Sequence, residues 1–232
     1  MTMAPQTSAT GPTPEGMRVL RRVRLAYILF RLGVYALIWT TAAGALEDWR
    51  QHPLWFVSMT VLLASFAYAR LKSAFTVAPT IEKKTLVMLR LSFLMGVGLA
   101  FLSAGRGWIP WAHNQTLLLI GGLPLIILGV SLLHRAQKAL APHYFEVVYV
   151  TAQQQCVDKE VYSHMRHPGY LGEYFITLGA VFMLNTLVGL MAVALLFGVA
   201  IMVRIHVEEK MLLDQLPGYD DYASRVKRFL VI

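Results

Sequence analysis

Cysteine is almost absent from this chain of 232 residues, which contains a single one, Cys156. One cysteine cannot form an intrachain disulfide or build a cysteine-rich zinc or iron–sulfur site, so the sequence predicts no metal centre. Charged residues are also scarce: they make up 15% of the chain, whereas soluble domains carry about 25%. The hydrophobic share is 56%. These totals argue against a soluble protein and favour a membrane protein.

Long apolar runs take the place of the missing charges, and a helix needs roughly 20 mostly apolar residues to cross the hydrocarbon layer. Four long runs cover residues 25–46, 53–71, 86–104 and 116–133, and two shorter runs cover 170–184 and 187–203. Only Asn185 and Thr186 separate the two short runs, which predicts a tight helical hairpin. None of the runs shows the period-two alternation of membrane strands. The sequence therefore predicts an all-α integral membrane protein with about six transmembrane helices.

Basic residues gather in the gaps between these runs, and the net charge is +8. With six spans, all of the 21 Lys and Arg residues except Arg31, Arg50, Arg90 and Arg106 fall on one side of the membrane. Because cytoplasmic loops carry an excess of Lys and Arg, both termini are expected in the cytoplasm and the protein in the cytoplasmic membrane. The scattered charges argue against a nucleic-acid-binding face.

The stretch MRHPGYLGEYF, residues 165–175, places charged and polar side chains at the mouth of the hairpin. Pro168 suits the first turn of a helix, where its missing N–H would have no partner. A helix N-terminus carries partial positive charge and free N–H groups, and Arg166 and His167 add donors to it. This end is therefore suited to hold a carboxylate or a phosphate. The alternative is that both side chains contact lipid headgroups.

A second polar stretch, RIHVEEKMLL over residues 204–213, follows the hairpin. Arg204 and Glu208 lie four residues apart on one helical face, and Glu209 comes next. A solvated ion pair there would contribute only a few tenths of a kcal/mol. However, the helix leaves the membrane beside the first stretch, so its two acids could bind an ammonium group or ribose hydroxyls while the first stretch binds a carboxylate. S-adenosylmethionine, with an amino acid end and a nucleoside end, has this pairing of charges.

The segments VYSHMRHPGYLGEYF, RIHVEEKMLL and GYDDYASRVKRFL resemble the carboxyl-terminal half of isoprenylcysteine carboxyl methyltransferases and of related phospholipid and bacterial methyltransferases. The likeness covers residues 134–232. The family pattern consists of a tyrosine, RHPxYxG, a hairpin, a glutamate pair, a tyrosine-rich segment and a final basic residue. In this chain the tyrosine is Tyr162, RHPxYxG covers residues 166–172, the glutamate pair is Glu208 with Glu209, the tyrosine-rich segment contains Tyr219 and Tyr222, and the final basic residue is Arg228. Many relatives read SGxYxxxRHP, whereas this chain reads DKEVYSHMRHP, so Glu160 or Val161 replaces the usual small residue.

This resemblance implies an S-adenosylmethionine-dependent methyltransferase whose cytoplasmic cofactor pocket is closed by the carboxyl-terminal segment. The resemblance assigns the catalytic region to residues 134–232, whereas composition and the apolar runs predict a disordered, Pro-, Thr- and Gly-rich tail (1–17) and four transmembrane helices (18–133) before it. The implied cofactor-binding residues are Tyr162, His164, Met165, Arg166, His167, Pro168, Tyr170, Glu208 and Glu209, and the implied catalytic residues are Arg204 and Glu209.

The implied reaction is in-line methyl transfer, with S-adenosylhomocysteine as product, to a lipophilic or small acceptor that enters laterally from the membrane lipids. Arg204 is expected to orient an acid group of the acceptor, or else to pair with Glu208. A carboxylate acceptor would need no base because it is already ionised at neutral pH. For an amine or thiol acceptor, Glu209 or His206 would be the base.

Two other functions stay open at the level of sequence. RHPGYLGE, with Glu173, also resembles a motif of steroid 5α-reductases and sterol reductases, which bind NADPH. The glutamate pair and the absence of an Asn- and Arg-rich nucleotide segment argue against this reading. A non-enzymatic channel or transporter would need polar residues within its spans, and the apolar runs offer only Arg31, Arg90 and a few hydroxyls.

Overall fold

The computed structural model describes residues 53–72, 83–111, 114–141 and 155–229, together with isolated positions between 25 and 37. The predicted tail (1–17) and most of the first predicted membrane helix (25–46) lie outside the described residues. Within the described ranges every regular element is a helix and none is a strand. The predicted all-α class is therefore confirmed for this part of the chain.

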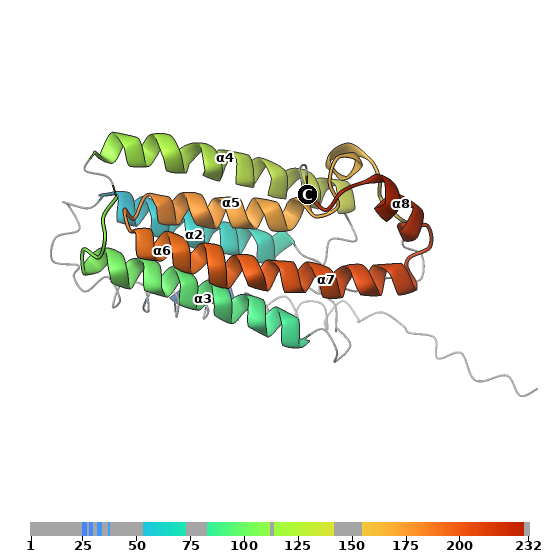
Figure 1. Cartoon of the computed structure of the whole chain (residues 1–232), viewed down its shortest axis with the longest axis horizontal. Helices are drawn as coiled ribbons and strands as arrows, with labels where there is room; N and C mark the ends of the chain where they lie inside the picture. Colours follow the sequence, from blue (N-terminus) through green and yellow to red (C-terminus); the bar gives the residue numbers. More distant parts are fainter. Residues whose placement is uncertain are drawn as a thin grey trace, which may run out of the picture.

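Long helices run side by side along one direction, and shorter elements connect them (Figure 1). The long helices are α2 (Pro53–Lys72), α3 (Lys83–Gly105), α4 (Gln115–Leu140), α5 (Pro168–Phe182) and α7 (Gly198–Gln215). A 3₁₀ turn (Glu160–Ser163) precedes α5, whereas α6 (Leu187–Ala192) and a π-helical turn (Val193–Phe197) run into α7, which α8 (Tyr219–Arg225) follows. The helices predicted over 53–71, 86–104 and 116–133 are thus confirmed.

Three described helical stretches are long and apolar enough to cross a membrane: Lys84–Gly105, Gln115–Leu140 and Leu187–Gln215. The two arms of the predicted hairpin are unequal. α5 has 15 residues, and at 1.5 Å per residue it is about 22 Å long, short of the roughly 30 Å of hydrocarbon. The second arm continues past the apolar run 187–203 to Gln215. The described residues therefore include three full-length spans of the six predicted. The first predicted span lies outside these residues, and α5 is too short to cross alone.

Apolar side chains cover the outer surface of α4. Leu117, Ile120 and Ile127 are 55%, 65% and 58% exposed. Soluble monomers rarely leave a contiguous patch of this kind open to water. Together with a mean hydropathy of +0.54, these exposed faces identify the chain as an integral membrane protein.

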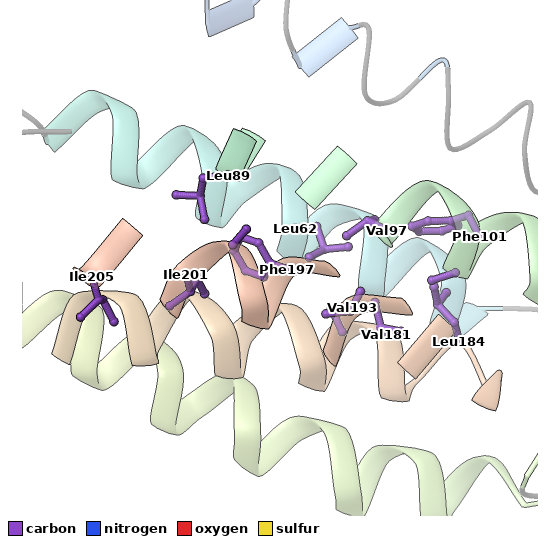
Figure 2. Close-up of a cluster of buried hydrophobic side chains, with 13 residues drawn as sticks. Leu62, Leu89, Val97, Phe101, Val181, Leu184, Val193, Phe197, Ile201 and Ile205 are labelled. Atoms are coloured by element: carbon purple, nitrogen blue, oxygen red, sulfur yellow. The ribbon is translucent and has the colours of Figure 1, made fainter. Parts of the chain in front are cut away.

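The interior of the bundle is a cluster of buried aliphatic and aromatic side chains drawn from α2, α3, α5 and the α6–α7 arm (Figure 2). Val97 and Phe101 of α3, Val181 of α5 and Phe197 of the π-helical turn all belong to this cluster, and each is at most 3% exposed. Phe197 also meets Phe93 edge-on, with ring centroids 5.4 Å apart. This core fixes α3 and α7 beside α5.

Glycine pairs bring α4 and α5 into close contact. A Cβ on Gly129 would lie 2.6 Å from the Gly172 carbonyl oxygen, and one on Gly122 would lie 2.6 Å from the Gly179 carbonyl oxygen. Each pair is seven residues, about two helical turns, from the other. Small residues at such intervals let two membrane helices approach until their backbones touch. The pairing also fixes the register of these antiparallel helices.

The two ends of the bundle differ in chemistry. At one end, Trp108 and Trp111 lie near the hairpin tip, where the Leu187 amide donates to the Ile109 carbonyl and the Ser103 and Thr186 hydroxyls are 2.7 Å apart. The opposite end holds the start of α3, the ends of α2 and α4, the start of α5 and the end of α7. There Tyr68 Oη of α2 lies 2.8 Å from His134 Nδ1 of α4. Both polar stretches of the sequence are at this second end.

Candidate functional site

A buried carboxylate joins the two polar stretches. Glu209 of α7 exposes only 8% of its side chain. Its Oε1 accepts hydrogen bonds from Arg166 Nε at 2.9 Å and Nη2 at 2.8 Å, and from His167 Nε2 at 3.0 Å. Its Oε2 accepts from Arg228 Nε and Nη2, both at 2.7 Å. Residues more than 40 positions apart in sequence therefore meet at one side chain.

The charges around Glu209 explain why an ionised acid can be buried here. Guanidinium groups stay protonated in proteins, so Arg166 and Arg228 hold the carboxylate in its ionised form. Hydrogen bonds between charged groups at these distances are about twice as strong as neutral ones. Desolvation of the carboxylate is offset only while these partners are in place. We call Glu209, Arg166, His167 and Arg228 the Glu209 cluster.

The carboxyl-terminal segment lies against the start of α5. The Arg166 amide donates to the Lys227 carbonyl at 2.9 Å, and Arg166 Nη1 donates to the carbonyls of Ala223 at 2.7 Å and Val226 at 2.5 Å. The predicted anion site at the start of α5 thus holds a carboxylate of the same chain, that of Glu209. The cluster ties α5, α7 and the end of the chain together.

A second hydrogen-bonded chain begins at Arg204, whose side chain is only 1% exposed. Its Nη1 donates to Thr85 Oγ1 of α3 at 2.6 Å, and its Nε donates to Tyr170 Oη at 3.1 Å. Tyr170 Oη in turn donates to Glu208 Oε2 at 2.7 Å. Arg204 and Glu208, predicted as an alternative ion pair, are thus connected through the phenol of Tyr170.

Three tyrosines pack where α8 meets the loop before α5. Tyr222 Oη donates to the Tyr162 carbonyl at 2.7 Å, and the rings of Tyr219 and Tyr222 meet edge-on with centroids 5.7 Å apart. Burial raises the pKa of the Tyr219 and Tyr222 phenols. At Tyr219 the negative charge of the Glu209 carboxylate raises the pKa further. Both therefore stay neutral at physiological pH and do not act as bases.

The predicted site residues do not all gather. Arg166, His167, Tyr170, Arg204, Glu208 and Glu209 lie within these two connected networks, and Met165 is buried beside them at 2% exposure. Pro168 opens α5 as predicted. His164 is exposed, and its Nδ1 lies 2.9 Å from Ser163 Oγ and 3.3 Å from the Glu160 carbonyl. His206 is also exposed.

Two residues of these networks were not among the predicted site residues. Arg228 appeared only as the final basic residue of the family pattern, although it makes two contacts of 2.7 Å with Glu209. Thr85 is 119 positions from Arg204 and had no motif around it, so nothing in the sequence could have indicated it. The position of α3 in the fold is what places its hydroxyl there.

The loop before α5 contains a strained residue. Glu160 has a φ of +54°, in the left-handed region that glycine adopts freely and other residues adopt at a cost. It occupies the position at which many relatives carry the glycine of SGxY. Glycine would adopt this conformation at position 160 without strain, whereas Lys159 has an extended φ of −109°.

We expect Glu160→Gly to stabilise the protein by about 1 kcal/mol, because glycine relieves the strain of a positive φ. Thermal unfolding of the detergent-solubilised protein would measure the change. Lys159→Gly is the matched control, and it should be neutral or destabilising because its extended backbone suits any residue. A lower midpoint for Glu160→Gly than for Lys159→Gly would contradict this explanation.

Comparison with known protein families matches the region that holds both networks except for Thr85 and Arg228. Residues 122–214 match the model described as the isoprenylcysteine carboxyl methyltransferase (ICMT) family. The match covers less than half of the chain, and we call residues 122–214 the ICMT-family segment. This segment includes α5, α7, the glycine pairs and Glu209, and ICMT is a family of methyltransferases. The resemblance predicted from RHPGY and the glutamate pair is confirmed, and the family that matches is not one of reductases. No curated protein matches the chain.

Proposed function

We propose that this protein is an integral membrane methyltransferase that uses S-adenosylmethionine and transfers its methyl group to a lipophilic or small acceptor. The observation that carries the proposal is the meeting of Arg166 and His167 with Glu209 at one end of the bundle. It places the two motifs of the ICMT-family segment in one buried polar site. A structural ion pair alone would not need the adjoining chain from Arg204 through Tyr170 to Glu208.

The residues present fit the chemistry of this cofactor. When bound, S-adenosylmethionine supplies a methyl group on a positively charged sulfur, together with a carboxylate, an ammonium group and an adenosine. Arg166 and His167 would donate to the cofactor's carboxylate in exchange for Glu209 Oε1, and Glu208 and the released Glu209 oxygen would accept from the ammonium group or the ribose. Buried polar groups that make no hydrogen bond among the described residues, at Gln137 and Tyr219, supply further recognition. Backbone groups of Tyr162 to Met165 line the adenosine end.

The surroundings of Glu209 favour an acceptor that is already ionised. Arg166, His167 and Arg228 donate to both of its oxygens, so the carboxylate is a weak base. His206, the other candidate base, is exposed on α7. A carboxylate acceptor needs no base, and its reaction would depend on orientation and exclusion of water. Arg204, buried and linked to Tyr170, would orient the acid group.

The length of α5 supports an acceptor that stays in the membrane. α5 starts about 22 Å from the hairpin tip, so its polar end lies within or at the edge of a hydrocarbon layer of roughly 30 Å. A lipophilic molecule could reach this depth from the side while its polar group meets Arg204. The proposed layout has six membrane segments with both termini and the site on the cytoplasmic side, as the basic residues indicate.

Ligand binding tests the proposal directly. S-adenosylhomocysteine should raise the thermal unfolding midpoint of the detergent-solubilised protein, since a ligand at 100 times its Kd stabilises the native state by about 2.7 kcal/mol. NADPH at equal concentration is the control and should leave the midpoint unchanged. Methyl transfer from labelled S-adenosylmethionine into a membrane-lipid extract would then identify the acceptor class. Stabilisation by NADPH and not by S-adenosylhomocysteine would overturn the proposal.

A further inference from the structure

Gln137 of α4 is buried and has no hydrogen-bonding partner among the residues that the structure describes. The residue is only 6% exposed. Neither its Nε2 nor its Oε1 makes a hydrogen bond within the part of the chain that the structure describes. A buried polar group left without a partner destabilises the protein that contains it. A donor and an acceptor held side by side in this way indicate a ligand with the matching pair of atoms.

The helix register places Gln137 beside the loop before α5. Gly129, Leu133 and Gln137 follow one another at four-residue intervals on the buried face of α4. A Cβ on Gly172 of α5 would lie 2.7 Å from the Gly129 carbonyl oxygen and 2.9 Å from the Leu133 nitrogen. Since α4 and α5 are antiparallel, Gln137, one turn beyond Leu133, comes level with Pro168 and the residues before it.

The neighbours of Gln137 point to the same place. Ala136, the preceding residue, packs in one cluster with Tyr162, Tyr219 and Tyr222. Tyr219 is only 4% exposed, and its hydroxyl also makes no hydrogen bond among the described residues. The Tyr162 to Met165 backbone, proposed above to line the adenosine, begins in this cluster. Two buried and unpartnered polar side chains thus lie on elements that flank a single loop.

We infer that Gln137 recognises the adenine edge of the nucleoside bound at this site. A carboxamide presents one donor and one acceptor in a plane, and adenine presents its N6 amine as donor beside a ring nitrogen as acceptor. Pairing the two satisfies both atoms of Gln137 at once. This inference rests on the proposed function, because it assigns the base-reading residue of the same cofactor site.

A double-mutant cycle in binding tests the inference without relying on turnover. Its ligands are S-adenosylhomocysteine and the analogue that lacks the 6-amino group, and calorimetry would give each Kd. The wild-type protein should bind the analogue about 10- to 100-fold more weakly, the discrimination of a bidentate pair. Gln137→Met should weaken binding of S-adenosylhomocysteine by a similar factor and bind the two ligands equally. Gln115→Met, at the exposed start of α4, is the matched control and should behave as wild type.

The ligand-free proteins provide a second measurement. Gln137→Met removes an unpartnered buried amide, so its unfolding midpoint without ligand should be equal to or higher than that of wild type. Gln137→Leu also removes both the donor and the acceptor, and it should show the same loss of discrimination if the methionine variant cannot be purified. Discrimination that persists in either variant would overturn the inference while leaving the proposed function intact. Absence of S-adenosylhomocysteine binding by the wild-type protein would overturn both.

Discussion

Glu209→Gln is expected to destabilise the protein by about 3 kcal/mol and to reduce S-adenosylhomocysteine binding more than 100-fold, since breaking a buried ion pair leaves its partners uncompensated. The substitution keeps the size of the side chain and removes one charge. Arg166 and His167, which lie 2.8–3.0 Å from Oε1, and Arg228, 2.7 Å from Oε2, would then lose their counter-ion. Thermal unfolding and calorimetric binding would measure the two effects.

Glu208→Gln is the matched control for this variant. It removes the same charge one position away on α7, but the hydrogen bond that Glu208 accepts comes from the neutral phenol of Tyr170. The amide can still accept that bond, so we expect a destabilisation of about 1 kcal/mol or less. Equal effects of the two substitutions on stability would show that Glu209 is not the residue that joins the motifs.

Proteolysis offers an independent measurement of the same cluster. Arg225, Lys227 and Arg228 lie in the segment that Glu209 fastens to the start of α5, and trypsin cleaves after such residues. Cleavage there should be slow in the wild-type protein and in Glu208→Gln, and fast in Glu209→Gln, because an open segment is accessible to the protease. Equal cleavage rates in all three proteins would contradict a fastening role for Glu209.

Gly172→Ala is expected to destabilise the protein by about 2–3 kcal/mol, because a methyl group inserted into a close-packed contact forces the helices apart. The added Cβ would lie 2.7 Å from the Gly129 carbonyl oxygen and 2.9 Å from the Leu133 nitrogen. Both atoms belong to the backbone of α4, so no side-chain rotation can relieve the clash. The yield of monodisperse protein and its unfolding midpoint would measure the loss.

Gly96→Ala on α3 is the corresponding control. The nearest atoms to its added Cβ belong to Val193 and Ala192, at 3.4–3.5 Å, which is ordinary van der Waals contact. Because alanine favours helix over glycine by roughly 1 kcal/mol, this substitution should be neutral or stabilising. A similar loss of stability in Gly96→Ala and Gly172→Ala would mean that the α4–α5 contact is no tighter than others in the bundle.

The proposed site and the glycine contacts depend on each other. Gly129 and Gly172 hold α4 and α5 in register, and this register brings Gln137 to the loop that precedes α5. A shift of one turn along α4 would carry the carboxamide about 5 Å away from that loop. We therefore expect the helix contact to contribute to ligand binding as well as to stability.

Much of the fold could be predicted because its causes are local. The apolar runs 53–71, 86–104 and 116–133 correspond to α2, α3 and α4, and Pro168 opens α5 as its fixed φ and missing N–H suggest. The length of α5 was less predictable. The apolar run 170–184 predicts a membrane segment. However, the turn at Asn185 ends the helix at Phe182, and its 15 residues are too few to cross the membrane alone.

The sequence by itself determined that this is an all-α membrane protein, and its motifs indicated an ICMT-family segment with Arg166, His167 and the two glutamates as site residues. Hydropathy, helix starts and motif spacing are properties of neighbouring residues, so they can be read along the chain. Only the tertiary structure decided that Glu209 binds Arg228 as well as Arg166, that Thr85 holds Arg204, and that Gln137 lies buried beside the site. Those contacts join residues from separate helices, and they depend on packing between helices that no local pattern encodes.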